Sequence, residues 1–489
     1  MCIRDRHWGS TRAFLANGFT ASDQTVVAGV RKLLPTFSLR VAGGEVALWN
    51  HWDRELDFDR RGFGDLDAHL DAYERVYRSG LSSYLGRRRP AELGCLLSGG
   101  HDTSFAFLQA SRVFGKPLHA FTATFPGWAF DEAEYARAVC DRYGGVFHPV
   151  PFLPAHLDRV VSLVRATEEP VVSSSLALHL IAAEASRHVE TMLGGDGGDT
   201  AWGEYYPVVE YHRWTKGLPL AAHKALHRLA GAAVRATDWE RFWELEHVAG
   251  LFATEDRYAD FMRRLLTYRH YSEADLRDLL RAETFAGETF SRSVLEIPVT
   301  RERFADDLIE SKLVNGFHPY MPLYTTKSMA HYGLDIFLPT LDREVMRFIT
   351  RLPMEWVNGG TTLQRLTNSK RINRRFHKAA LARHLGPGAV RNLSFDIPWH
   401  AILRPRTRVL ELLLARLKRR GWFQDARLDR LFAEFQSQRV KPHELLELKH
   451  HGYRVFALLS LEVWCTEYLD GRMTEDPDAD LRLEDYLAS

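Results

Sequence analysis

The sequence predicts an α/β protein in which a parallel sheet with helices on both faces is followed by a mainly helical region. Between residues 93 and 202, short apolar runs alternate with stretches of helical pattern, as expected for strands joined by crossover helices. After residue 202, long amphipathic stretches dominate the pattern. Because ligands of parallel sheets bind at the carboxyl ends of the strands, motifs at those positions are the first candidates for a site.

The predicted elements follow one another at short intervals. Strands are expected at residues 93–97, 118–125, 146–150 and, as the last strand, 191–193. Helices are expected at residues 103–114, 131–143, 155–167 and 176–188, and further along at 240–251, 342–349, 410–419 and 453–469. Residues 13–53 are interpreted as turns and short strands, because side chains alternate at 38–41 and 45–48.

Composition narrows the class of protein. The 489 residues carry 64 Lys and Arg against 63 Asp and Glu, which gives no electrostatic reason to expect nucleic acid or an anionic membrane as partner. The apolar run at residues 455–465 is too short to cross a bilayer, and no secretory leader is recognised. The four cysteines are scattered, so the sequence predicts a cytoplasmic protein without a structural zinc site. The 22 histidines include no HExxH pattern and are interpreted as surface or core residues.

The strongest motif is SGGHDTS, residues 98–104, between a predicted strand and a predicted helix. Gly99 and Gly100 allow a tight turn that brings backbone N–H groups and the start of a helix against a phosphate. The hydroxyls of Ser98, Thr103 and Ser104 can donate to phosphate oxygens. A Walker-type loop would end in Lys-Ser or Lys-Thr, and this one does not. The segment predicts a pyrophosphate-binding loop, and the alternative is an ordinary strand-to-helix turn.

A second glycine-rich turn, GGDGGD at residues 194–199, follows the last predicted strand. Carboxylates in such a turn suit magnesium, which takes few protein ligands besides phosphate oxygens. Alone, the turn is equally compatible with a metal-free surface loop. Together, the two motifs predict that Asp102 and Asp199 converge on one metal–pyrophosphate group at the carboxyl edge of the sheet.

This pair of motifs resembles the asparagine synthetase family, within the wider Rossmann-like ATP-pyrophosphatase group. Similar segments lie at residues 119–125, 131–137, 327–331 and 338–342, and the resemblance runs from Leu93 to Pro398. It implies binding of ATP with Mg²⁺, and a nucleotide base beside Leu97, Ala123, Gly194 and Gly195. It also implies that a carboxylate attacks the α-phosphorus to give an acyl-adenylate, from which ammonia or an amine displaces AMP. Thiolating or nucleotide-forming relatives share only the first motif.

Residues 14–53 resemble, more weakly, the last segment of the family's glutaminase domain, which normally starts with a nucleophilic cysteine. Cys2 is not expected to act as that nucleophile, because the long intervening chain and the following Gly-Ile are missing. Four units are therefore predicted. They are a glutaminase remnant at residues 1–62, the ATP-pyrophosphatase core at 63–204, a helical remainder at 205–473, and a mobile or late-packing acidic tail at 474–489.

The sequence departs from the family pattern in the half that handles the acceptor. Thr200 and Glu204 stand where an acidic residue and a glycine are usual, Thr325-Thr326 replaces an Asp-Arg pair, and Phe337 replaces an arginine. Leu393 stands where a lysine should stabilise the transition state. The candidate substitutes for that cation, each with a structural role as the alternative, are Arg391, Lys370 and Arg371.

Three functions are compatible with a phosphate-binding half that matches the family and an acceptor half that departs from it. The default is asparagine synthesis from aspartate, the second is a specialised relative that makes a lactam or a cyclised peptide, and the third is a degenerate nucleotide-binding partner protein. The expected partners are a small carboxylate or a peptide substrate and, as the nitrogen source, ammonia or a separate glutaminase. A homodimer is compatible with the sequence, whereas nucleic acid and membranes are not expected.

Overall fold

The computed structural model describes residues 6–20, 23–35, 37–50, 64–128, 131–172, 174–202, 206–237, 240–255, 258, 261, 265, 270–285, 299–315, 317–367, 374–386, 397–437, 451–473 and 481–489. No helix in these ranges is both long enough and apolar enough to cross a bilayer.

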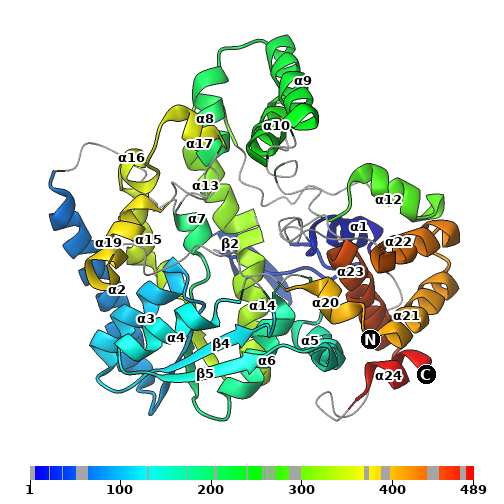
Figure 1. The fold of residues 1–489 in the computed structure, drawn as a ribbon, viewed down its shortest axis with the longest axis horizontal. Helices are drawn as coiled ribbons and strands as arrows, with labels where there is room; N and C mark the ends of the chain where they lie inside the picture. The colour runs from blue at the N-terminus through cyan, green and yellow to red at the C-terminus, as the bar shows by residue number, and fades with distance from the viewer. Residues whose placement is uncertain are drawn as a thin grey trace.

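A five-stranded, all-parallel sheet lies at the centre of the α/β part (Figure 1). Its strands, in spatial order, are β5 Val146–Pro151, β4 His119–Thr124, β3 Leu93–Leu96, β6 Thr191–Leu193 and β7 Asp335–Phe337. The predicted parallel sheet is confirmed. The prediction that residues 191–193 form the last strand is wrong, because β7 pairs with β6 from within the helical region. β7 has only three residues, which are too few to show an alternating pattern in the sequence. It is a strand because it pairs with β6.

Helices cover both faces of the sheet, as predicted. One face packs against a cluster that includes α2, α3 and α4, and the other against a cluster that includes α5, α6 and α14. The first half of the chain contains α2 Leu66–Arg88, α3 His101–Phe114, α4 Ala133–Arg142, η1 Pro154–Arg159, α5 Val160–Thr167, α6 Ser175–Ala185 and α7 Gly198–Ala201. Thus α3 begins two residues before its predicted start, so Asp102 belongs to its first turn.

The remainder of the described chain is mainly helical, as predicted. Its elements are α8 Tyr206–Thr215, α9 Leu220–Thr237, α10 Glu240–Phe252, α12 Glu273–Leu279, η2 Ala282–Phe285, α13 Phe304–Asn315, α14 Phe317–His331, η3 Pro339–Leu341, α15 Arg343–Thr350, α16 Met354–Val357, α17 Thr362–Thr367, α19 Arg375–Leu385, α20 Trp399–Leu403, α21 Thr407–Arg420, α22 Asp425–Ser437, α23 His451–Trp464, the π-helix η5 Cys465–Leu469 and α24 Leu483–Ala488.

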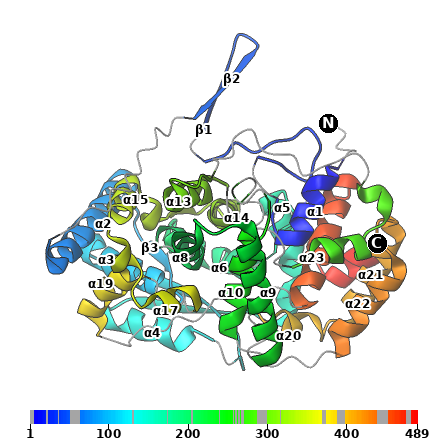
Figure 2. The same cartoon turned by 90° about the horizontal axis from the view of Figure 1, so that it is seen from above.

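The N-terminal segment contains a helix that the sequence pattern did not reveal. Residues 13–17, interpreted as turns and short strands, belong to α1 (Trp8–Asn17). Nearly every residue of α1 is buried, so the helix has no polar stripe to mark its period. The predicted alternation is confirmed further on, where β1 (Phe37–Ala42) and β2 (Glu45–Asn50) form a hairpin that stands out from the body of the protein (Figure 2).

Buried contacts tie this N-terminal segment to the rest of the chain. Phe14, Leu15 and Phe19 belong to the same apolar cluster as α5, α6 and α23. The ammonium group of Lys32 lies 2.8 Å from Glu169, and the hydroxyl of Tyr324 in α14 donates to the same carboxylate. Residues 6–35 therefore share a core with the predicted synthetase units, and the predicted unit boundaries remain a prediction.

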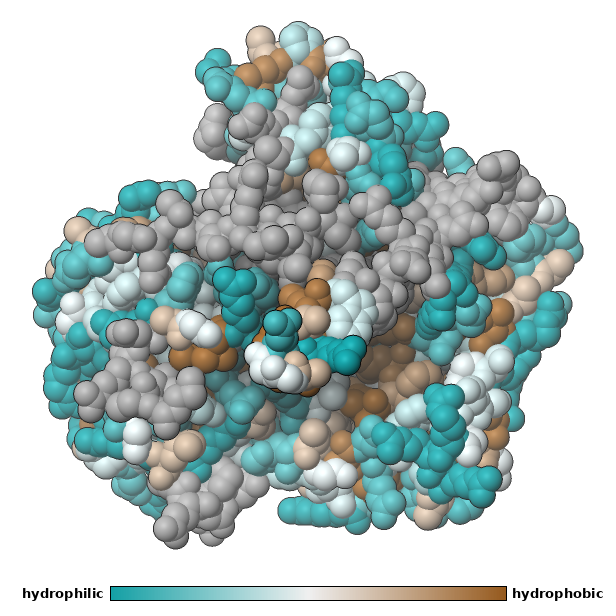
Figure 3. Space-filling model, turned by 180° about the vertical axis from the view of Figure 1, so that it is seen from behind, coloured by the Kyte–Doolittle hydropathy of each residue, from teal (hydrophilic) through white to brown (hydrophobic). Residues whose placement is uncertain are grey.

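The C-terminal residues pack rather than project. The acidic tail is predicted to be either mobile or packed late in folding. Leu483 and Leu487 of α24 are buried against α21, so residues 481–489 of that tail are packed. Leucines four positions apart lie on one face of a helix, which explains the packing of this otherwise acidic segment. Seen from behind, the described surface is mainly hydrophilic, and apolar residues gather around a hollow near its middle (Figure 3).

Candidate functional site

The predicted pyrophosphate loop joins β3 to α3 at the carboxyl edge of the sheet. Gly99 has a φ of 75°, in the region that favours glycine. A Cβ atom there would lie 2.6 Å from Cβ of Tyr135 and 2.8 Å from the backbone nitrogen of Ala136. Helix α4 therefore leaves no room for a side chain at this turn, and it holds the loop backbone against the start of α3.

Hydroxyl groups close this loop on itself. The N–H of Ser98 donates to Thr103 Oγ1 at 3.2 Å, and the N–H of Gly100 donates to Ser98 Oγ at 3.2 Å. Ser104 Oγ is buried and has no hydrogen-bond partner among the described residues. The first N–H groups of a helix lack intrahelical acceptors, so the start of α3 is an anion-binding position. The loop has the donors and the shape that a phosphate requires.

The second predicted loop lies directly against the first, because β6 pairs with β3. A Cβ atom on Gly195 would lie 2.7 Å from Cγ2 of Thr103, and one on Gly198 would lie 2.5 Å from the carboxyl carbon of Asp102. Glycine at both positions allows this close approach. The structure thus brings the two predicted loops together, although the side chain of Asp199, in α7, lies outside the described residues.

The carboxylate of Asp102 contacts two basic side chains. It lies 2.7 Å from Arg374 Nη1 and 3.2 Å from His377 Nε2. Burial disfavours the carboxylate, but Arg374 and His377 outweigh it and lower the pKa of Asp102 to about 2. The side chain is therefore ionised at neutral pH, which is the form that holds a metal ion.

Sequence reasoning missed the cationic residues around Asp102. Arg374 precedes α19 in a left-handed conformation, with a φ of 59°, and Lys378 lies one helical turn later. Such a conformation costs a residue other than glycine about 1 kcal/mol or more and is common at functional sites. No local motif marks these residues, because more than 250 positions separate Arg374 from Asp102 in the sequence.

A second carboxylate, that of Asp196, lies in the neighbouring loop. Thr325 Oγ1 donates to it at 2.9 Å. Burial raises the pKa of Asp196, the hydrogen bond from Thr325 opposes this rise, and nearby Asp102 adds to it. Thr325, one of the departures from the family pattern, therefore positions a carboxylate of the second loop.

The remaining predicted residues fall in three groups. Leu97 and Ala123 are buried at the carboxyl ends of β3 and β4, on opposite faces of the sheet, and their predicted place beside a nucleotide base remains a prediction. Phe337 stacks on Tyr84 with a centroid distance of 4.3 Å. Predicted residues that lie outside the described residues are Cys2, Glu204, Lys370, Arg371, Arg391 and Leu393.

Glu132, just before α4, makes the stability of this region depend on pH. Burial and the neighbouring Asp131 raise its pKa to about 8 from 4.5. The folded chain then keeps a proton that the unfolded chain releases, so the free energy of unfolding falls as pH rises from about 5 to about 8. We expect a slope of up to about 1.4 kcal/mol per pH unit, measured by urea unfolding.

The variant Glu132→Gln is expected to remove this slope, because glutamine cannot lose a proton. The variant Glu134→Gln, changed at an exposed position in the first turn of α4, is the control and should retain the slope. Equal slopes in Glu132→Gln and the unmodified protein would contradict the prediction.

Comparisons with known proteins agree with this arrangement. A family model described as asparagine synthase matches residues 88–466. A putative glutamine-hydrolyzing asparagine synthetase of Mycobacterium tuberculosis H37Rv is 26% identical over 360 residues, which cover 69% of this chain and 47% of the relative. The glutamine-hydrolyzing asparagine synthetase 1 of Bacillus subtilis 168 is 27% identical over 202 residues, which cover 39% of this chain and 30% of the relative. The chain thus spans about half of the M. tuberculosis relative.

Proposed function

Because the chain belongs to the asparagine synthase family, we propose that it is an ATP-dependent, AMP-forming amide synthetase of the cytoplasm. A substrate carboxylate attacks the α-phosphorus of ATP, which forms an acyl-adenylate and releases pyrophosphate. Ammonia or an amine then attacks the acyl carbon, forms the C–N bond and displaces AMP. Asparagine synthesis from aspartate is the default activity, since the similar curated proteins carry that name.

The observation that supports this proposal most is the contact between the two glycine-rich loops. Gly195 lies against Thr103 and Gly198 against Asp102, so phosphate donors and carboxylates meet at one edge of the sheet. Neither loop alone would distinguish a nucleotide site from an ordinary turn. Their contact supports the proposal, because an in-line attack on ATP would need phosphate donors and metal ligands from loops that lie side by side.

The residues present fit magnesium. Asp102 and Asp196 supply carboxylate oxygens, the ligands that Mg²⁺ prefers, and their mutual repulsion, one cause of the raised pKa of Asp196, would be relieved by a cation. We propose Asp102 and Asp199 as the magnesium ligands. Asp196 lies in the same loop as Asp199 and accepts a hydrogen bond from Thr325. Magnesium would supply positive charge to the pyrophosphate oxygens.

We assign to Arg374 the role of the cation that the sequence lacks at Leu393. Its guanidinium lies 2.7 Å from the carboxylate of Asp102 at the start of α3. Lys378 is less suited, because burial, together with Arg374, lowers its pKa to about 8. Arg374 would thus stabilise the negative charge that collects on the departing pyrophosphate.

The proposal is tested by measuring pyrophosphate release from ATP and Mg²⁺ with aspartate or other carboxylates, each with ammonia or glutamine. We expect release that depends on both the carboxylate and Mg²⁺, with AMP formed in equal amount. Release with ammonia but not with glutamine would indicate that nitrogen comes from solution or from a separate glutaminase. ATP binding without release for any carboxylate or peptide would contradict the proposal and favour a nucleotide-binding partner protein.

A second candidate is a specialised synthetase that forms a lactam or cyclises a peptide. It is favoured by the acceptor side of the site, where Thr325 takes the place of a charged pair and Phe337 packs on Tyr84. The same assay separates the two, because only the specialised enzyme would release pyrophosphate with another carboxylate and not with aspartate.

A further inference from the structure

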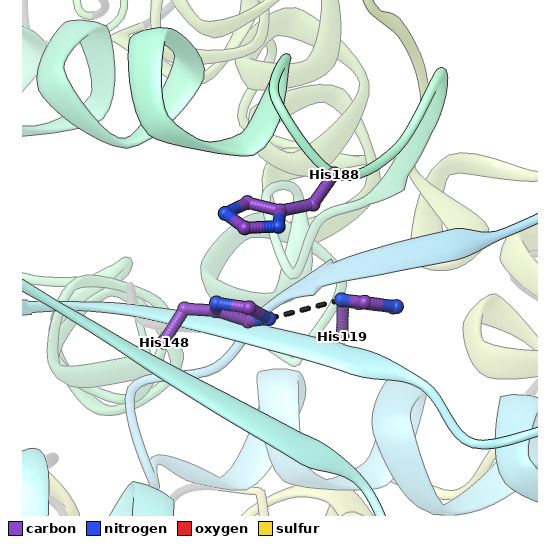
Figure 4. A group of neighbouring side chains, drawn as sticks. All are labelled: His119, His148 and His188. Carbon is purple, nitrogen blue, oxygen red and sulfur yellow. Dashed lines mark hydrogen bonds between the residues drawn. The ribbon is translucent and has the colours of Figure 1, made fainter.

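Three histidines from separate parts of the chain meet on the sheet face that α6 covers (Figure 4). His119 begins β4, His148 is the third residue of β5, and His188 lies between α6 and β6. One ring nitrogen from each lies within 4.8 Å of the other two. The closest pair is His119 Nδ1 and His148 Nε2, at 2.9 Å. All three rings are half-buried, so they remain within reach of small solutes.

A carboxylate is hydrogen-bonded to the opposite nitrogen of one of these rings, and a second carboxylate lies near that of another. His188 Nε2 lies 3.0 Å from Glu184 Oε1, and His119 Nε2 lies 3.6 Å from Glu92 Oε2. This leaves Nδ1 of both rings for the centre of the cluster, together with Nε2 of His148. A carboxylate on the outer nitrogen is the usual partner of a metal-binding histidine, because it fixes the ring and makes the inner nitrogen more basic.

We propose that His119, His148 and His188 bind one zinc ion. Imidazole nitrogens suit zinc, and three histidines leave the fourth tetrahedral position to water, which the half-buried cluster admits. Bonds of about 2.0–2.1 Å require ligand atoms about 3.4 Å apart. The closest pair, at 2.9 Å, is nearly at this spacing, and the nitrogen of His188 lies no more than 4.8 Å from either.

The hydrogen bond inside the cluster agrees with metal binding, because a metal ion would take the place of the shared proton. Without a metal, the 2.9 Å contact between His119 and His148 requires that one nitrogen carries a proton and the other does not.

The site lies away from the nucleotide loops. His119 is the first residue of β4, whereas the loops follow the last residues of β3 and β6. The zinc would join β4, β5 and the α6–β6 connection, so its expected effect is on the stability of the sheet rather than on the reaction. This separates it from the proposed magnesium site.

The test uses the full chain, stripped of metal with EDTA and then titrated with zinc against a chromophoric chelator. We expect one equivalent of zinc to bind and to raise the Tm. The variants His148→Ala and His188→Ala should lose this zinc, and Glu184→Gln should bind it roughly 10–100-fold more weakly. The control is His69→Ala, which changes a half-buried histidine of α2 that contacts Trp356 edge-on and should keep the zinc.

A second measurement uses the unmodified protein, so its result does not depend on whether the variants fold. Cobalt added to the unmodified, metal-free protein should give the strong visible absorption of a tetrahedral site, and zinc should abolish it. Pyrophosphate release by His148→Ala should match that of the unmodified protein, since the site is not catalytic. Absence of zinc binding by the unmodified protein, or undiminished binding by both histidine variants, would overturn the proposal.

Discussion

Replacing Asp102 with asparagine is expected to lower magnesium-dependent pyrophosphate release by about 10²-fold or more. The change removes the charge that the start of α3 presents to the metal while leaving the side-chain volume almost unchanged. Asp158, which lies 2.7 Å from Arg406 and far from the two loops in the sequence, offers a matched control. The variant Asp158→Asn should release pyrophosphate at the normal rate. Normal release by Asp102→Asn would refute the assignment of the site.

The same change is expected to destabilise the fold, and the two effects can be separated. Asp102→Asn leaves the guanidinium of Arg374 largely buried without its carboxylate, which should cost about 3 kcal/mol of unfolding free energy. The double variant Asp102→Asn/Arg374→Met removes both charges and should recover most of that loss. It should remain inactive. Recovery of turnover along with stability would mean that Asp102 acts only through folding.

The largest effect on stability alone is expected from Glu462→Gln. The carboxylate of Glu462, in α23, is 1% exposed and accepts from Arg416 Nε at 2.7 Å and from Arg420 Nε at 2.8 Å. Without its charge, Arg416 loses its closest carboxylate partner in the core and Arg420 keeps Asp470, near the surface. The free energy of unfolding should therefore fall by about 3–5 kcal/mol. Urea unfolding followed by circular dichroism measures the change.

The control for this prediction is a glutamate that also pairs with an arginine, but on the surface. Glu434 lies 2.7 Å from Arg430, one helical turn away in α22, and both side chains are exposed to solvent. Because water and salt screen such a pair, Glu434→Gln should change stability far less than Glu462→Gln. Similar effects of the two substitutions would show that burial adds nothing to the first pair.

Local patterns were sufficient to predict four strands of the parallel sheet and its two loops, but not β7. Residues 98–104 and 194–199 each follow a short apolar strand, and a parallel sheet aligns the carboxyl ends of its strands. The contact between Gly198 and Asp102 therefore follows from topology. The roles of the loops remain predictions, since their shape alone does not identify what they bind.

The features that the sequence did not predict depend on contacts between distant segments. Arg374 reaches Asp102 only because α19 packs against α3. His119, His148 and His188 follow no metal-binding spacing, and only the pairing of β4 with β5 and the packing of α6 bring them together. Propensity and spacing describe neighbours along the chain, so neither could reveal groups assembled by tertiary packing.

The ion pair between Lys32 and Glu169 has a consequence for dividing the protein into pieces. A fragment cut to residues 88–466, the limits of the family match, would lack Lys32, α1 and α24. Glu169 would lose the ion pair with Lys32, and the apolar surfaces that Phe14 and Leu487 cover would face water. The segment that matches the family model is thus smaller than the packed structure, because α1 and α24 on either side of it bury part of its apolar core.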